Sequence, residues 1–195
     1  VLLLTAETYN KHLHPRDKGN RTIFGDAATA TVVSTEGFAE ICNFSLGTDG
    51  RGAENLMIRT GGARYPEKAG DLTFDENGNP HSSDFLFMNG AEIFTFTQKN
   101  VPIVVKDTLA KNGLEQDDIA TFVFHQANSY MLNFLRKKIK IAPERFYINM
   151  SDVGNTVSNS IPVALSQAGA ELHGRVLICG FGVGYSWGGC VLDFK

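Results

Sequence analysis

The chain has 195 residues, of which 43% are hydrophobic and 20% charged, with a formal net charge of -3. This composition is typical of a folded globular domain, and the weak acidic charge argues against nucleic acid as the main partner. No apolar run approaches the ~20 residues of a membrane span, and the first residues lack the basic start of a signal peptide. Three cysteines without a C-x-x-C pair argue against a disulfide framework or a zinc site and favour a reducing cytoplasm.

The first half of the chain reads mainly as strands and loops. Residues 1–6 form an apolar run typical of a strand, and we expect this strand to need partners that the chain does not contain. A polar loop follows over residues 10–21. Two strands of small and β-branched residues are predicted over 23–34 and 40–47. Residues 48–84 are rich in Gly and charge, which favours excursions over the surface.

The second half begins with a long helical pattern. Apolar residues at steps of three and four predict a helix over residues 88–112. We expect a kink or a break near Val101, because Pro102 follows it within the pattern. An apolar strand over 121–124 then precedes a helix predicted over 129–139, with Met131, Leu132, Leu135 and Ile139 on one face.

The remaining elements continue this alternation. A short apolar run over residues 146–150 precedes a helix predicted over 158–172, whose Pro162 lies in the first turn. The chain closes with two apolar strands around a Gly-rich turn, which predict an antiparallel hairpin. Strands, alternating helices and a terminal hairpin describe half of a layered α/β protein.

Two polar strings lie where a predicted strand gives way to a predicted helix. F-V-F-H-Q-A-N carries His125 and Asn128, and D-V-G-N-T-V-S-N-S-I-P carries Asn155. Sites of open α/β sheets form outside the carboxyl ends of the strands. A neutral imidazole and a carboxamide that converge there can hold a developing oxyanion, which points to carbonyl chemistry. Taken singly, however, a His after a strand is usually structural, and an Asn in a Gly-Asn turn usually serves the turn.

Five strings in order carry a resemblance to a known family. Besides H-Q-A-N and G-N-T-V-S-N-S-I-P, the chain contains I-F-G-D-A-A-T-A, M-N-G-A-E-I-F and G-F-G-V-G-Y-S-W-G. It resembles the C-terminal part of β-ketoacyl-acyl-carrier-protein synthase III, a condensing enzyme of the thiolase fold. The resemblance implies a thiolase-like layered α/β fold with a mixed five-stranded sheet flanked by helices. Residues 1–24 would be the tail of the N-terminal half, and residues 25–195 the C-terminal half.

The resemblance also implies an activity. The enzyme would be an acyltransferase that condenses an acyl-CoA starter with malonyl-acyl carrier protein by decarboxylative Claisen chemistry in fatty acid biosynthesis, without a cofactor or metal. His125 and Asn155 would be the catalytic pair. None of the three cysteines stands in the context of the family's nucleophile, so we expect that Cys upstream of Val1 and the chain alone to be incomplete. The complete enzyme is expected to be a cytoplasmic homodimer that includes the N-terminal half.

Further residues fall at binding positions of the family. The implied substrate-binding residues are Ala127, Asn128, Phe181, Gly182, Met88, Gly90 and Phe94. Lys137 and Lys138 would dock the acyl carrier protein. The family commonly has Arg where Tyr130 stands and Lys where Thr95 stands, so the basic surface is thinner here.

Other interpretations stay open beside this one. The chain could belong to a starter ketosynthase of polyketide or other secondary metabolism, or to a non-catalytic condensing-enzyme-like subunit. Phe181 could be a core residue alone. His12 and His14 form H-x-H in a loop without a third ligand, which favours a solvated loop over a metal site. The terminal Gly-rich string lacks dinucleotide-binding spacing.

Overall fold

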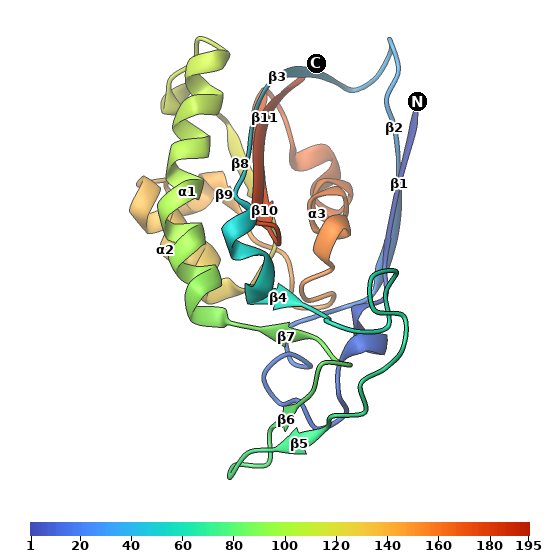
Figure 1. Ribbon diagram of the computed structural model, residues 1–195. Helices are drawn as coiled ribbons and strands as arrows, with labels where there is room; N and C mark the ends of the chain where they lie inside the picture. Colours follow the sequence, from blue (N-terminus) through green and yellow to red (C-terminus); the bar gives the residue numbers. More distant parts are fainter.

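A mixed five-stranded sheet forms the centre of the molecule in the computed structural model, which describes residues 1–195 (Figure 1). The strands lie in the order β3 (Ala39–Thr48), β11 (Ser186–Phe194), β10 (Arg175–Gly182), β8 (Thr121–Phe124) and β9 (Phe146–Tyr147). β10, β8 and β9 run parallel, whereas β3 and β11 pair antiparallel. The expected mixed five-stranded sheet is confirmed, and so is the antiparallel terminal hairpin.

Helices cover both faces of this sheet. α1 (Gly90–Lys111) and α2 (Ser129–Ile139) lie on one face, and α3 (Ser160–Ala168) lies on the other (Figure 1). The bounds predicted for the second helix are confirmed. Met131, Leu132 and Leu135 are buried as the spacing indicates, whereas Ile139, predicted on the same face, is only partly buried. The apolar core therefore lies mainly between the sheet and the α1–α2 layer.

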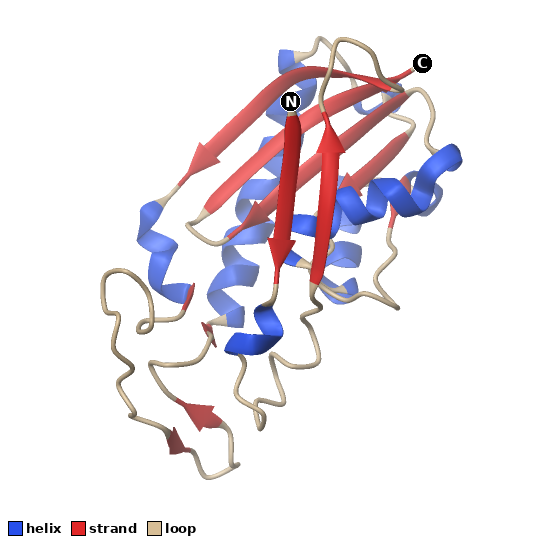
Figure 2. Ribbon diagram, turned by 90° about the vertical axis from the view of Figure 1, so that its right-hand side faces the viewer, coloured by secondary structure: helices blue, strands red, loops and turns tan.

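A separate two-stranded sheet forms a further layer outside α3. β1 (Leu2–Glu7) pairs antiparallel with β2 (Ala27–Val32), and both views place this pair beyond α3 from the central sheet (Figures 1 and 2). The expectation that the first strand lacks a partner within the chain is wrong, because the loop after β1 turns back and brings β2 alongside. The predicted division after residue 24 stays a prediction, and β1 and β2 pair across it.

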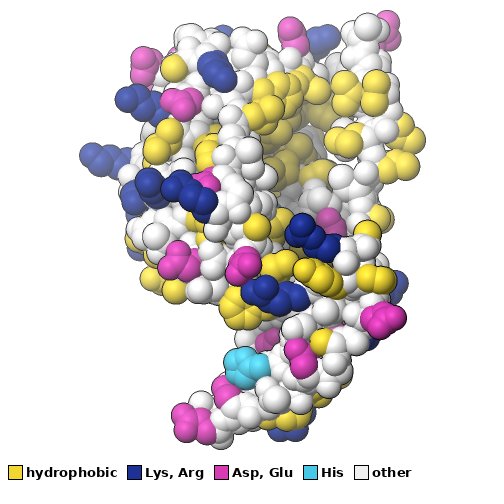
Figure 3. Space-filling view, in the orientation of Figure 1, with side chains coloured by type: hydrophobic (Ala, Val, Ile, Leu, Met, Phe, Trp, Pro, Cys, Tyr) yellow, Lys and Arg dark blue, Asp and Glu magenta, His cyan; other side chains and the backbone are white.

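The exposed side of β1 and β2 is strongly apolar. Leu2, Leu4 and Val32 share one face of the pair and are 57%, 66% and 74% exposed, and Leu3 on the opposite face is 52% exposed. Hydrophobic side chains gather over this part of the molecule in Figure 3. Neither strand pairs with another strand at its outer edge. Such a surface is typically covered in a stable protein, because exposed apolar strands promote association.

The first predicted helix does not break. α1 runs unbroken from Gly90 to Lys111 with Pro102 inside it. Of the kink or break expected near Val101, the break is therefore wrong and the kink stays a prediction. Val101, Val104 and Val105 are almost fully buried on the flanks of Pro102. Their packing against the sheet compensates for the hydrogen bond that proline removes.

Three other elements are shorter than predicted. The strand predicted over 23–34 forms only over Ala27–Val32. The third helix is α-helical only over Ser160–Ala168, between 3-10 turns at Val157–Asn159 and Gly169–Glu171. Pro162 lies in its first turn, as expected. The apolar run at 146–150 forms strand only over Phe146–Tyr147.

Residues 56–88 form an extension of loops and short strand pairs, apart from the central sheet (Figure 2). β4 (Leu56–Met57) pairs with β7 (Phe87–Met88), and β5 (Thr73–Phe74) pairs with β6 (Pro80–His81). The remaining 3-10 turns are Tyr9–His12, Gly50–Asn55, Gln116–Asp118 and Pro143–Arg145. None of the helices combines the length and the apolar character that crossing a membrane requires.

Candidate active site

Three parallel strands bring the candidate residues to one edge of the sheet. His125 follows β8 directly, Phe181 lies near the end of β10, and Asn155 lies on the segment that continues from β9. The amide of His125 donates to the carbonyl of Cys179 at 2.8 Å, so the β8–β10 ladder extends to the site. Carboxyl ends of parallel strands are where α/β sheets build binding sites.

The His125 side chain is partly buried and held on two sides. Its Nδ1 lies 2.6 Å from the Ser160 hydroxyl oxygen, and its ring meets that of Phe181 edge-on, with centroids 5.3 Å apart. Burial lowers the pKa of His125 to about 4, so the imidazole is neutral at pH 7. Its Nε2 has no hydrogen-bond partner within the chain.

Asn155 is fixed through both its backbone and its side chain. It is 7% exposed and forms a parallel bridge with Phe24. Its Oδ1 accepts from the amide of Val157 at 2.9 Å, which leaves Nδ2 without a partner in the chain. Val157 adopts φ +55°, which costs a β-branched residue roughly 1–3 kcal/mol. The turn therefore holds the carboxamide through Oδ1 and leaves its Nδ2 donor free.

Two glycines allow this turn to approach the segment before β2. A Cβ on Gly25 would lie 1.9 Å from the carbonyl oxygen of Val153, and one on Gly154 would lie 2.8 Å from the carbonyl oxygen of Ile23. Gly154 also has φ +64°. The I-F-G-D and G-N-T strings are thus in direct backbone contact, which is why both are needed to place Asn155.

Sequence reasoning missed two buried polar residues beside the pair. Gln126 is 2% exposed, and its Nε2 donates to the carbonyl of Phe124 at 2.7 Å while its Oε1 accepts from the amide of Asn149 at 3.0 Å. It ties the loop after β8 to the segment after β9. Ser160, which contacts His125, is the second. Both lie within strings that carry the family resemblance, Gln126 in H-Q-A-N and Ser160 in G-N-T-V-S-N-S-I-P, which was the available signal.

The other residues predicted near the pair have structural partners as well. The amide of Ala127 donates to the carbonyl of His125 at 2.9 Å, and Asn128 caps α2 by accepting from the amide of Met131 at 2.8 Å. Phe181 is 8% exposed and belongs to the apolar core as well as contacting His125. Gly182 ends β10 beside open space.

A surface on α1 and α2 gathers the remaining predicted residues. Met88 ends β7 and Gly90 begins α1, one turn before Phe94. The Phe94 ring lies 5.8 Å from that of Tyr130 and 4.9 Å from that of Phe134. The last turn of α2 carries Lys137 and Lys138, both exposed, and the ammonium of Lys138 lies 5.7 Å from the Phe134 ring. Apolar and basic groups therefore share this surface.

Two family models match the chain in order. 3-Oxoacyl-[acyl-carrier-protein (ACP)] synthase III matches residues 1–50, and 3-Oxoacyl-[acyl-carrier-protein (ACP)] synthase III C terminal matches residues 109–194. The chain is 32% identical over 199 residues to β-ketoacyl-[acyl-carrier-protein] synthase III of Nitratidesulfovibrio vulgaris, covering 100% of this chain and 58% of that protein. The chain belongs to the 3-oxoacyl-[acyl-carrier-protein] synthase III family.

Solved structures of the synthase III family share the fold. The crystal structure of a 3-oxoacyl-(acyl-carrier-protein) synthase III superposes with a TM-score of 0.91 at 45% identity, covering 99% of this chain and 60% of that one. The priming β-ketosynthase of the R1128 polyketide pathway gives 0.81 at 27% identity, covering 100% and 58%. The thiolase-like fold expected from the sequence is confirmed. The chain spans about three fifths of the length of these relatives.

The three thiols of this synthase III chain ionise less readily than a free cysteine. Burial raises the pKa of Cys179 to about 12 and that of Cys190 to about 11, and it also raises the pKa of Cys42. A thiol must ionise to attack a thioester. Cys179 and Cys190 are therefore poorly suited to carry an acyl group near neutral pH.

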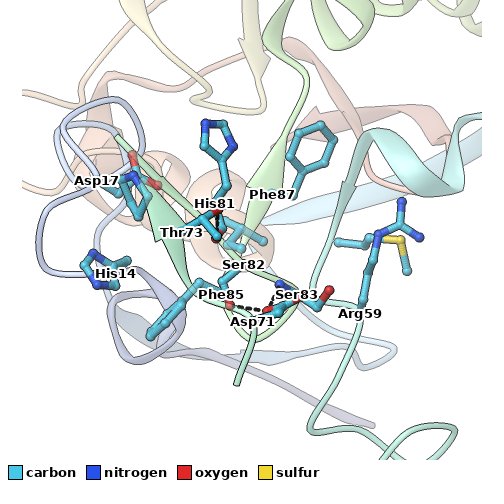
Figure 4. Close-up of a pocket in the computed structure, with 13 residues that line it drawn as sticks. His14, Asp17, Arg59, Asp71, Thr73, His81, Ser82, Ser83, Phe85 and Phe87 are labelled. Atoms are coloured by element: carbon cyan, nitrogen blue, oxygen red, sulfur yellow. Dashed lines mark hydrogen bonds between the residues drawn. The ribbon is translucent and has the colours of Figure 1, made fainter. Parts of the chain in front are cut away.

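Two cavities lie away from His125 and Asn155. One of about 330 Å³ adjoins the Gly-rich turn and is lined mostly by apolar side chains, among them Leu56, Met57, Ile58, Leu86 and Val183. The other, of about 340 Å³, lies between the loop that carries His14 and the β5–β6 pair (Figure 4). There Asp71 accepts hydrogen bonds from Ser82 and Ser83, which lower the pKa of that carboxyl. No group of three or more His, Cys, Asp or Glu side chains is placed to hold a metal ion.

Proposed function

We propose that the chain supplies the oxyanion-stabilising part of a β-ketoacyl-acyl-carrier-protein synthase III. One observation is the main support for this proposal. Nε2 of His125 and Nδ2 of Asn155 lie at one edge of the sheet, and neither nitrogen has a hydrogen-bond partner within the chain. When a malonyl thioester loses CO2, the electron pair of the broken carbon–carbon bond moves onto the thioester oxygen. Two neutral donors stabilise this oxyanion without having to gain or lose a proton.

The condensation then follows from the same arrangement. The resulting enolate carbon attacks the carbonyl of an acyl group carried as a thioester on a cysteine, and the cysteine thiolate leaves. The product is a β-ketoacyl thioester on the carrier protein. The Phe181 ring beside His125 would line the place of the malonyl carboxylate, with Gly182 allowing close approach of the backbone. No cofactor is needed, because the departing CO2 drives carbon–carbon bond formation.

We infer that the nucleophilic cysteine comes from an N-terminal half of the same enzyme. Cys179 and Cys190 are poorly suited to the role, and the chain spans about three fifths of its relatives. The exposed apolar side of β1 and β2 offers that half a surface to cover. A cytoplasmic homodimer of the complete enzyme belongs to this proposal.

The acyl chain, the pantetheine arm and the carrier protein would contact the residues predicted to bind substrate and carrier. The 330 Å³ apolar cavity beside Val183 fits the acyl chain of an acyl-CoA starter, and Met88, Gly90 and Phe94 lie on its approach in the proposal. Ala127 and Asn128 would line the pantetheine arm. Lys137 and Lys138 would attract the acidic acyl carrier protein.

A starter ketosynthase of polyketide metabolism is the second candidate. Two observations favour it: the structural similarity to the R1128 priming β-ketosynthase, and Tyr130 at the position where the family commonly has Arg. Both candidates share the chemistry of His125 and Asn155. Turnover with the carrier protein of fatty acid synthesis compared with that of a polyketide pathway distinguishes them.

The test is substitution of the pair in the complete enzyme. We expect His125→Ala or Asn155→Ala to lower CO2 release from a malonyl thioester on the order of a hundred- to a thousand-fold. Acyl transfer from CoA to the cysteine should survive in part, because a helix N-terminus can lower a thiol pKa without this pair. Mass spectrometry of the acyl-enzyme and a CO2 assay separate the two steps.

Two results would contradict the proposal. CO2 release near the parent rate in either variant would show that the pair is not catalytic. A parent enzyme that neither takes up an acyl group nor releases CO2 would instead support a non-catalytic subunit. Asn155→Asp is the matched variant, since it keeps the Oδ1 acceptor for Val157 but replaces the donor with a carboxylate oxygen. We expect it to be as inactive as Asn155→Ala.

A further inference from the structure

Ser160 makes the only side-chain hydrogen bond of His125. Its hydroxyl oxygen lies 2.6 Å from Nδ1, and Ser160 is 3% exposed at the start of α3. No other group of the chain bonds to this hydroxyl. The donor in this contact therefore decides which nitrogen of His125 carries the proton.

The need to satisfy the buried hydroxyl hydrogen of Ser160 identifies the donor in its contact with His125. If Nδ1 carried the proton and donated it, the Ser160 hydroxyl hydrogen would be buried without an acceptor, which is costly. Nε2 would then present a lone pair to the site where negative charge is proposed to develop. If Ser160 donates to Nδ1, the hydroxyl is satisfied and the proton resides on Nε2.

We propose that Ser160 is a positioning residue that holds His125 in the Nε2-protonated tautomer. Its consequence for catalysis rests on the proposed function, whereas the tautomer itself does not. Phe181 supports the same orientation, because its ring meets the imidazole at 83° and limits rotation. Ser160 touches no substrate in this proposal and acts only through His125.

The tautomer can be observed directly. Nitrogen-15 NMR of the complete protein, labelled in histidine, distinguishes a protonated from an unprotonated imidazole nitrogen. His125→Gln assigns the signal, since the chain contains five histidines. We expect the parent to carry the proton on Nε2, Ser160→Ala to show a mixture of tautomers, and Ser160→Thr to retain the single tautomer. A parent with the proton on Nδ1, or an unchanged spectrum in Ser160→Ala, would overturn the inference.

Activity gives a second, separable readout. We expect Ser160→Ala to lower the kcat of CO2 release about tenfold with little change in KM, and Ser160→Thr to restore it. Thr108→Val is the matched control, because it also removes a buried hydroxyl but one that, unlike that of Ser160, has no hydrogen-bond partner. It should leave both the tautomer and kcat unchanged.

The two proposals fail in different ways. If His125→Ala leaves CO2 release intact while Ser160→Ala shifts the tautomer, the proposed function is wrong and the role of Ser160 stands. If the tautomer is the same with and without Ser160 while His125→Ala is inactive, the role of Ser160 is wrong. Should Ser160→Ala not fold, the parent spectrum alone decides, because it shows which nitrogen is protonated.

Discussion

The side-chain oxygen of Asn159 accepts a hydrogen bond from the Thr5 hydroxyl at 2.7 Å, across 154 residues of sequence. Thr29 donates to the same oxygen at 3.1 Å, and Asn159 Nδ2 donates to the carbonyl of Ala27 at 3.0 Å. Asn159 is completely buried. One side chain thus joins β1, β2 and the turn that enters α3, directly beside Ser160.

We expect Asn159→Ala to destabilise the fold by about 3 kcal/mol, because it leaves several buried polar groups without partners. Urea unfolding measures the change in the free energy of unfolding. Asn133→Ala is the control, since Asn133 is exposed on α2 and bonds only to the carbonyl of Ser129. Equal stabilities of the two variants would show that the buried contacts of Asn159 contribute nothing.

Gly25→Ala should damage both stability and the site. The added Cβ would lie 1.9 Å from the carbonyl oxygen of Val153, so the turn that carries Asn155 must move. We expect a loss of about 2 kcal/mol or more in thermal unfolding, together with a fall in CO2 release by the complete enzyme. Gly62→Ala, where a Cβ meets open space, should change neither. Full activity of Gly25→Ala would contradict the close approach.

The pKa of His125 predicts two pH effects. Burial lowers it from 6.5 to about 4, so the unfolded chain binds this proton at higher pH than the folded chain. The contribution to stability is complete above pH 6.5 and is lost as pH falls through 6.5 toward 4. Urea unfolding of the parent against His125→Asn should show this extra slope in the parent alone. The kcat of CO2 release should stay flat through pH 6.5, and a step there would contradict a neutral, buried imidazole.

Charge reversal at Lys137 and Lys138 tests carrier docking. Changing both to Glu should raise the KM for malonyl-carrier protein about tenfold and weaken its salt dependence, because exposed charges steer an acidic partner. Acyl transfer from CoA should remain. Lys106→Glu, an exposed lysine of α1, is the control. Equal losses in both half-reactions would indicate a folding defect instead of a lost docking surface.

Much of the fold follows from local pattern. The spacing of Met131, Leu132 and Leu135 predicted α2 with its buried face, and the apolar run before His125 predicted β8. The same apolar run predicted that His125 follows a buried strand. These features depend on neighbours a few residues apart, where side-chain periodicity is informative.

The continuity of α1 and the pairing of β1 with β2 depend on tertiary packing, which the spacing of apolar residues in the sequence does not reveal. The valines beside Pro102 bury themselves against the sheet and keep α1 continuous, which overrides the local cost of proline. β1 pairs with β2 because the loop between them folds back, although the sequence of neither strand indicates which strand it pairs with.

The sequence by itself determined the family strings, the order of the elements and the pair His125 and Asn155, because each lies within one short stretch of chain. Only the tertiary structure decided which buried polar groups satisfy one another. Ser160 meets His125 from 35 residues away, and Asn159 joins strands more than a hundred residues distant. The physical reason is that a buried donor must find an acceptor, and which acceptor is near depends on how the layers pack.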